Sequence, residues 1–147
     1  MELDYKMYRK VKIYFNKVCK ALINLEKLQE RSSLAFGKTL LESRVVEMQL
    51  TQAQLVNHFI NPNLKLPYVP AYRCKALTSW YMDEKLFSCR NLNSFNSMLI
   101  KEDEKALKEI GYITEDLLFS SPLETLFKDH RKRLKKLSIT KDVLNEL

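Results

Sequence analysis

The chain has little glycine and proline, with two glycines and four prolines among 147 residues. Folds rich in β-strands use both residues at their turns, so the shortage predicts few turns and long helices. No apolar run approaches the roughly 18 residues that a membrane-spanning helix needs. The first ten residues, MELDYKMYRK, hold neither the apolar core of a secretory signal nor a glycine after Met1 for myristoylation. We therefore expect a helical protein without a targeting or membrane-spanning segment.

Cysteine and histidine are also scarce. The three cysteines are Cys19, Cys74 and Cys89, an odd number without the close spacing of a metal knuckle. This usage is typical of a compartment that keeps thiols reduced, so we expect an intracellular protein, cytoplasmic or nuclear. His58 and His130 are the only histidines, and neither has a second histidine or a carboxylate at the spacing of a zinc-binding helix.

Most catalytic motifs are missing. Gly37 and Gly111 are too far apart to form a loop that cradles phosphates. The acidic residues 102–104 lack the spacing of a calcium loop, and we interpret them as the solvated start of a helix. A nucleophilic cysteine–histidine pair stays open, because such partners meet in space rather than in sequence. We expect no enzymatic activity, no cofactor and no metal.

An apolar heptad stripe runs along the N-terminal segment. Its members are spaced alternately three and four residues apart, which predicts a helix with a coiled-coil type of seam. Lysine and arginine fall on the other side of the same helical wheel. The first predicted seam consists of Tyr8, Val11, Phe15, Val18, Leu22 and Leu25.

A second stripe follows in a different phase, and its predicted seam consists of Leu41, Val45, Met48 and Leu55. The sequence RSSLAFGK joins the two stripes and contains no proline. Either one long helix shifts its phase here, or Ser32 or Ser33 caps a new helix. The stripes pair with each other inside the chain or with a partner helix, and Lys38 and Gln52 at seam positions would favour one register.

The length favours a single helical domain over residues 1–147, with three parts. Residues 1–60 form the heptad segment. Residues 61–72 carry three prolines and are too apolar for a solvated linker, so we expect an extended strap that lies on the helices or docks a partner. Residues 73–147 form shorter helices that pack back. Trp80, the only tryptophan, is expected in the core, within a short helix in residues 73–90.

Local capping signals predict where the remaining helices begin and end. A helix from about Met98 to Ile110 is expected to end at Gly111, which suits a left-handed C-terminal cap. Ser121, Pro122 and Glu124 match a capping box with proline at the first helical position, so the next helix begins there and ends near Leu137. A last short helix is expected over residues 138–147.

The helix after Pro122 is amphipathic, and His130 lies on its apolar side, where we expect a hydrogen-bonded core or interface histidine. From Lys128 to Lys141 there are seven lysines and arginines against one acid, Asp129. The predicted basic face, for an acidic partner or phosphates, consists of Lys128, Arg131, Lys132, Arg133, Lys135 and Lys136.

Together these features predict an all-α fold: a long N-terminal helix or helical hairpin, a proline-rich strap, then shorter helices. The function we expect is that of a non-enzymatic adaptor or scaffold subunit that binds protein partners, in a hetero- or homo-oligomer, through its helices. One alternative is a sequence-nonspecific nucleic-acid binder that uses the basic helix, because lysine and arginine hold phosphates without reading bases. The other is a peripheral binder of anionic membranes. The net charge of +7 is compatible with all three, and with a merely solvated surface.

Overall fold

The structure, a computed structural model, describes residues 5–59, 78–116 and 122–146, and the side chains of residues 7–57, 78–115 and 122–137. Within these ranges every regular element is a helix, so the predicted all-α bundle is confirmed. In chain order the elements are α1 (Tyr5–Gln29), the 3₁₀ helix η1 (Ser32–Gly37), α2 (Lys38–Phe59), α4 (Glu84–Phe87), α5 (Leu92–Asp116) and α6 (Pro122–Glu146).

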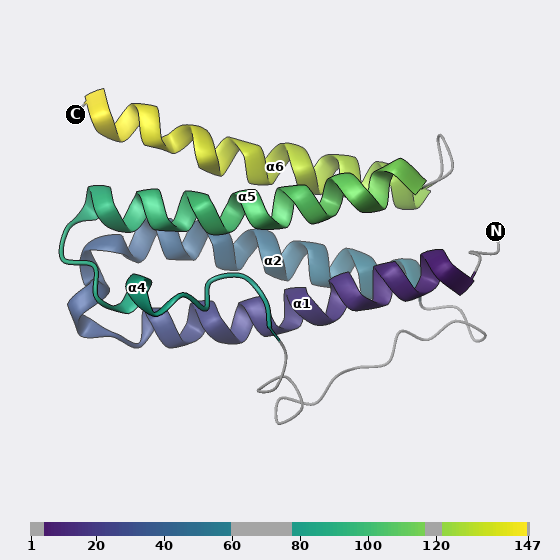
Figure 1. The fold of residues 1–147 in the computed structure, drawn as a ribbon, viewed down its shortest axis with the longest axis horizontal. Coiled ribbons are helices and arrows are strands. Elements are labelled where there is room, and N and C mark those ends of the chain that lie inside the picture. The colour runs from purple at the N-terminus through teal and green to yellow at the C-terminus, as the bar shows by residue number, and fades with distance from the viewer. Residues whose placement is uncertain (1–4, 60–77, 117–121, 147) are drawn as a thin grey trace.

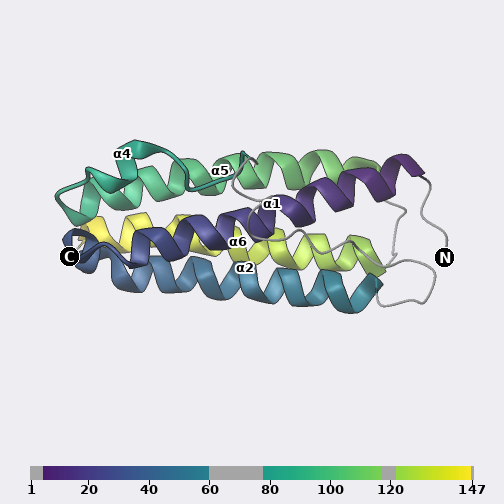
Figure 2. The same ribbon diagram turned by 90° about the horizontal axis from the view of Figure 1, so that it is seen from below.

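The long helices α1, α2, α5 and α6 lie side by side along the long axis of the molecule (Figures 1 and 2). Packing runs around a ring: α1 on α2, α2 on α6, α6 on α5, and α5 on α1. Neighbours in this ring run in opposite directions, as the colour gradient in Figure 1 shows. The helices α1 and α6 therefore face each other diagonally across the core.

The join between the two heptad stripes is a hairpin. The helix α1 ends at Gln29, and the chain reverses through η1 before α2 begins at Lys38 (Figure 1). Leu34 has a non-helical backbone there and is buried, so it anchors the turn on the core. Of the two alternatives, a long helix or a helical hairpin, the hairpin is the one found. The prediction of a serine cap is wrong, because η1 follows Arg31 without a side-chain cap.

Helix boundaries differ from the predictions at both ends of α5. The helix begins at Leu92, six residues earlier than expected, because the side chain of Asn91 accepts a hydrogen bond from the Ser94 amide at 2.8 Å. It also continues through Gly111, which has no positive φ, to Asp116. Gly111 is thus an interior helix residue and not a cap.

The C-terminal helix α6 begins at Pro122, as predicted, and continues to Glu146. The expected break near Leu137 is wrong, because the last predicted helix is continuous with α6. The proposed cap Ser121 and the proline strap 61–72 lie outside the described residues.

Within the expected helical region 73–90, the described residues contain only the short helix α4, capped by Asp83. Before it, Trp80 is buried, as predicted. Tyr81 is buried and has a φ of +66°, a conformation that non-glycine residues rarely adopt. The hydrogen bonds of Tyr81 to Glu102 and Asp103 hold the chain in this conformation.

Candidate functional site

The ten predicted seam residues lie in the core of the protein itself. Tyr8 and Val45 are partly buried and pack against the core. The other eight are buried: Val11, Phe15, Val18, Leu22, Leu25, Leu41, Met48 and Leu55. Since α1 packs on α2, the two stripes meet inside the chain, which is one of the two arrangements expected. A role of these residues in holding a partner stays a prediction, and in this structure their side chains are largely covered.

A polar cluster crosses the core beneath these seams. His130 on α6 is fully buried, and its Nε2 lies 2.6 Å from the Tyr14 hydroxyl on α1. Its Nδ1 lies 2.7 Å from Glu47 Oε1 and 2.9 Å from Thr51 Oγ1, both on α2. With its proton on Nδ1, the ring donates to Glu47 and accepts from Tyr14. The expectation of a hydrogen-bonded core histidine is confirmed.

Glu47 has a further hydrogen-bond donor, the guanidinium of Arg133. Arg133 Nε donates to both carboxylate oxygens of Glu47, at 2.8 and 3.0 Å, and Arg133 Nη2 donates to Gln54 at 3.3 Å. Burial alone would raise the pKa of Glu47, but the hydrogen bonds and charges of His130 and Arg133 outweigh it and lower the pKa. Arg133, predicted to belong to the basic face, is thus turned toward α2 and is half-buried.

A second buried cluster joins α2 to α5. Arg44 is fully buried and donates from Nη2 to Asp103 Oδ2 at 2.7 Å and from Nε to Oδ1 at 3.3 Å. The Tyr81 hydroxyl donates to the same carboxylate at 2.5 Å, and the Tyr81 amide donates to Glu102 at 2.9 Å. Our interpretation of residues 102–104 as solvated is therefore wrong for Glu102 and Asp103, because Arg44 and Tyr81 supply partners in the core; Glu104 is exposed.

In this second cluster, burial is the largest influence on the pKa values of Asp103 and Tyr81. It raises the pKa of Asp103, against the opposing charge and hydrogen bonds of Arg44. It also raises the pKa of Tyr81 well above 10.0, with help from the Asp103 charge. No local pattern signals this pairing, because Arg44 and Asp103 lie 59 residues apart in the chain.

These two clusters fix the rotation of α2 about its own axis. Arg44 and Glu47 are the only charged residues between Ser43 and Asn57, and both point into the core. Turning α2 would leave a buried charge without its partner, which costs several kcal/mol. The opposite side of α2 is therefore held toward the outside of the bundle.

That side, which we call the α2 outward face, is exposed along its whole length. Its positions recur every three or four residues, as in a helix seam. It consists of Thr39, Glu42, Val46, Gln49, Leu50, Ala53, Val56 and Asn57. Val46 is the most exposed of its large apolar side chains, at 62%. From Ser43 to Asn57, about 22 Å of helix, no exposed side chain is charged.

The sequence contained a signal for this face, in the spacing of Val46, Gln49, Ala53 and Val56. It was obscured because the core-facing stripe of α2 runs beside it, so apolar residues occur around much of the helix. Periodicity alone does not separate two apolar sides of one helix.

A basic surface lies on α6. Of its predicted residues, the exposed ones are Lys128, Arg131, Lys132, Lys135 and Lys136, which we call the α6 basic face. Lys128 forms an ion pair with Glu124 at 3.0 Å. Since α1 lies diagonally across the core from α6, the basic residues of the two terminal helices do not lie side by side.

In the described part of the chain, no group of three or more histidine, cysteine or acidic residues is placed to hold a metal ion. None of the described helices is long and apolar enough to cross a membrane. Comparison with known proteins found no match to this chain among family models, curated proteins or solved structures.

Proposed function

We propose that this protein is a non-enzymatic helical adaptor subunit, and that it docks an amphipathic helix of a partner protein on the α2 outward face. The observation that carries the proposal is that the α2 outward face exposes no charged side chain over about four turns, from Ser43 to Asn57. In the whole chain, 29% of the residues are charged. Charged residues are depleted at the centres of protein interfaces, while scattered exposed charges are the rule on solvated helices.

The composition of the face suits helix packing. Val46, Leu50 and Val56 supply apolar area, and Ala53 allows a second backbone to approach closely. Gln49 places one polar group among them, and a polar residue in a helix seam favours one register of the partner. Burial of the apolar side chains would thus drive the binding of a partner helix, and Gln49 would favour one register of that helix.

The non-enzymatic part of the proposal is supported by the burial of the His130 cluster. A histidine between a carboxylate and a hydroxyl is a common catalytic arrangement. Here, however, His130 has no exposed surface, and Glu47 is 5% exposed. A substrate could reach neither group without opening the bundle, so we assign the cluster to the stability and alignment of the helices.

The test is isolation of the tagged protein with its partners from its native cell extract, in the presence of nuclease. Val46→Glu with Ala53→Glu puts two charges on the α2 outward face, at exposed positions where folding is little affected. The matched control, Gln29→Glu with Asn93→Glu, adds the same charges at exposed positions elsewhere. We expect stoichiometric protein partners with the wild type and the control, and their loss with the α2 variant. An unchanged set of partners in the α2 variant would refute the proposal.

A second candidate function, nonspecific binding of nucleic acid, is favoured by the α6 basic face. Arg131, Lys132, Lys135 and Lys136 form no ion pair within the described part of the chain and point outward along two turns of α6. Such an array suits contacts with phosphates. It predicts an affinity for duplex DNA or RNA that falls with salt, with a log–log slope of about −0.9 per phosphate neutralised on B-DNA. A flat salt dependence would exclude this function.

A further inference from the structure

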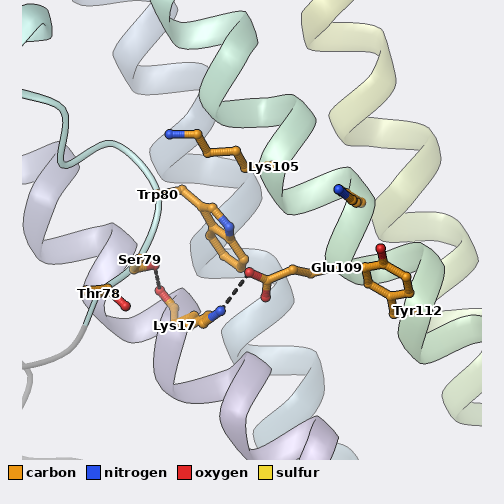
Figure 3. A pocket seen from close by; sticks show the side chains of 8 residues that line it. Lys17, Thr78, Ser79, Trp80, Lys105, Glu109 and Tyr112 are labelled. Atoms are coloured by element: carbon orange, nitrogen blue, oxygen red, sulfur yellow. Dashed lines mark hydrogen bonds and ion pairs between the residues drawn. The ribbon is translucent and has the colours of Figure 1, made fainter.

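A pocket opens on the side of the bundle where α1 meets α5, away from the contact of α2 with α6 (Figure 3). Its volume is about 410 Å³, within the range of small-molecule sites. Lys17 of α1, residues 78–80 and one face of α5 line it. The α5 residues are Lys105, Lys108, Glu109 and Tyr112.

The floor of this pocket is firmly held. Ser79 Oγ donates to the Lys17 carbonyl at 2.6 Å, and Asn24 donates to the Trp80 carbonyl at 3.0 Å. Trp80 is buried and also packs on Tyr14, with ring centroids 5.1 Å apart. The loop before α4 is thus fixed against α1, and the pocket does not need a ligand to form.

The charges in the pocket do not cancel. Lys17 pairs with Glu109 at 2.6 Å, and Figure 3 shows these two side chains meeting near Trp80. Lys105 pairs with Glu102 at 2.5 Å, but its side chain is 61% exposed. Lys108, one turn further along α5, makes no ion pair with any described residue. The pocket therefore offers positive charge to an anion.

We propose that this pocket binds an organic phosphate that carries a flat ring. The cations in the lining are all lysines, which bind phosphate as compact point charges, whereas planar carboxylates are matched best by the fork of an arginine. Tyr112, 55% exposed at the rim, offers aromatic surface to the ring, while Trp80, only 2% exposed, lies at the floor close enough to report on a bound ligand. A volume of about 410 Å³ also exceeds what an inorganic phosphate alone would fill.

The chain provides its own reporter, since its only tryptophan is Trp80. Titration of the full chain with phenyl phosphate, inorganic phosphate and benzoate, followed by tryptophan emission, tests the proposal. We expect a saturable change with phenyl phosphate, and binding of inorganic phosphate and of benzoate that is about tenfold weaker or more. No saturable change with phenyl phosphate, or equal affinity for benzoate, would overturn the proposal.

Substitutions then locate the site. Lys108→Gln should weaken binding of phenyl phosphate about tenfold, the effect of losing one charge-assisted contact. Tyr112→Ala should reduce the advantage of phenyl phosphate over inorganic phosphate, because it removes ring contact and no charge. Lys101→Gln, an exposed lysine on α5 outside the pocket, should bind as the wild type does. If Lys108→Gln and Lys101→Gln, both folded by circular dichroism, bind phenyl phosphate alike, the pocket is not the site.

Discussion

Arg44 has no exposed surface, and its charge is balanced in the core by Asp103. Asp103→Asn should cost about 3–5 kcal/mol in the free energy of unfolding, since it leaves the guanidinium buried without a counter-charge. Replacing both partners, Arg44→Met with Asp103→Leu, should cost less than the single change, because no unpaired charge remains. Urea unfolding of the three proteins measures both values. A loss below about 1 kcal/mol in the single variant would show that the pair is not structural.

Glu47 makes the free energy of unfolding depend on pH in the acidic range. Its pKa in the folded protein is lowered from the ordinary value of 4.5, so it contributes stability above that value. This contribution is lost as the pH falls through the lower pKa of the folded state. The raised pKa of Asp103 acts in the opposite direction, because the folded protein takes up that proton first.

We therefore expect Glu47→Gln to unfold more easily than the wild type at pH 7 and to differ less from it at about pH 3. Thermal unfolding across this range measures the difference. A constant gap between the two proteins at every pH would mean that the charge of Glu47 does not contribute.

At the scale of the helix, replacing each of the two glycines by alanine should change the free energy of unfolding in opposite directions. At Gly37, a Cβ atom would overlap the buried ring of Phe95, so Gly37→Ala should destabilise by about 1–3 kcal/mol. At Gly111, inside α5, a Cβ atom would meet nothing within 4 Å, so Gly111→Ala should stabilise by about 1 kcal/mol through helix propensity. Melting temperatures that move in the same direction would contradict this description of the two sites.

The helices were predictable where one periodic face meets the core. The stripe from Val11 to Leu25 predicted α1, and Pro122 marked the first residue of α6. Boundaries failed where a single local signal competed with packing: Gly111 suits a cap, yet Ile110 and Ile113 are buried on either side of it and keep α5 helical.

The candidate surfaces were predictable to different degrees. Clustered charge on one side of α6 is visible in the sequence, so the basic face was found, except that Glu47 draws Arg133 toward α2. The α2 outward face and the pocket were missed. Each depends on contacts between distant segments, which decide which side of α2 is covered and bring Lys17 and Lys108 into the lining of one pocket.

At the scale of the molecule, the distribution of charge is uneven. The α6 basic face and the exposed lysines of α5 account for part of the net charge of +7, while the α2 outward face carries none from Ser43 to Asn57. A net positive charge opposes contact with a basic partner, and this repulsion is weakest where the surface carries no charge. Contact with a partner is therefore least opposed by charge at α2.

The most direct measurement is site-specific photo-crosslinking in the native cell. A photoreactive residue is placed at Gln49, on the α2 outward face, or at Lys132, on the α6 basic face; both positions are exposed. We expect a defined crosslinked protein from position 49 that disappears when Val46→Glu is added, and none of comparable yield from position 132. Crosslinks to nucleic acid from position 132, with no protein adduct from position 49, would contradict the adaptor proposal and favour the basic helix as the functional surface.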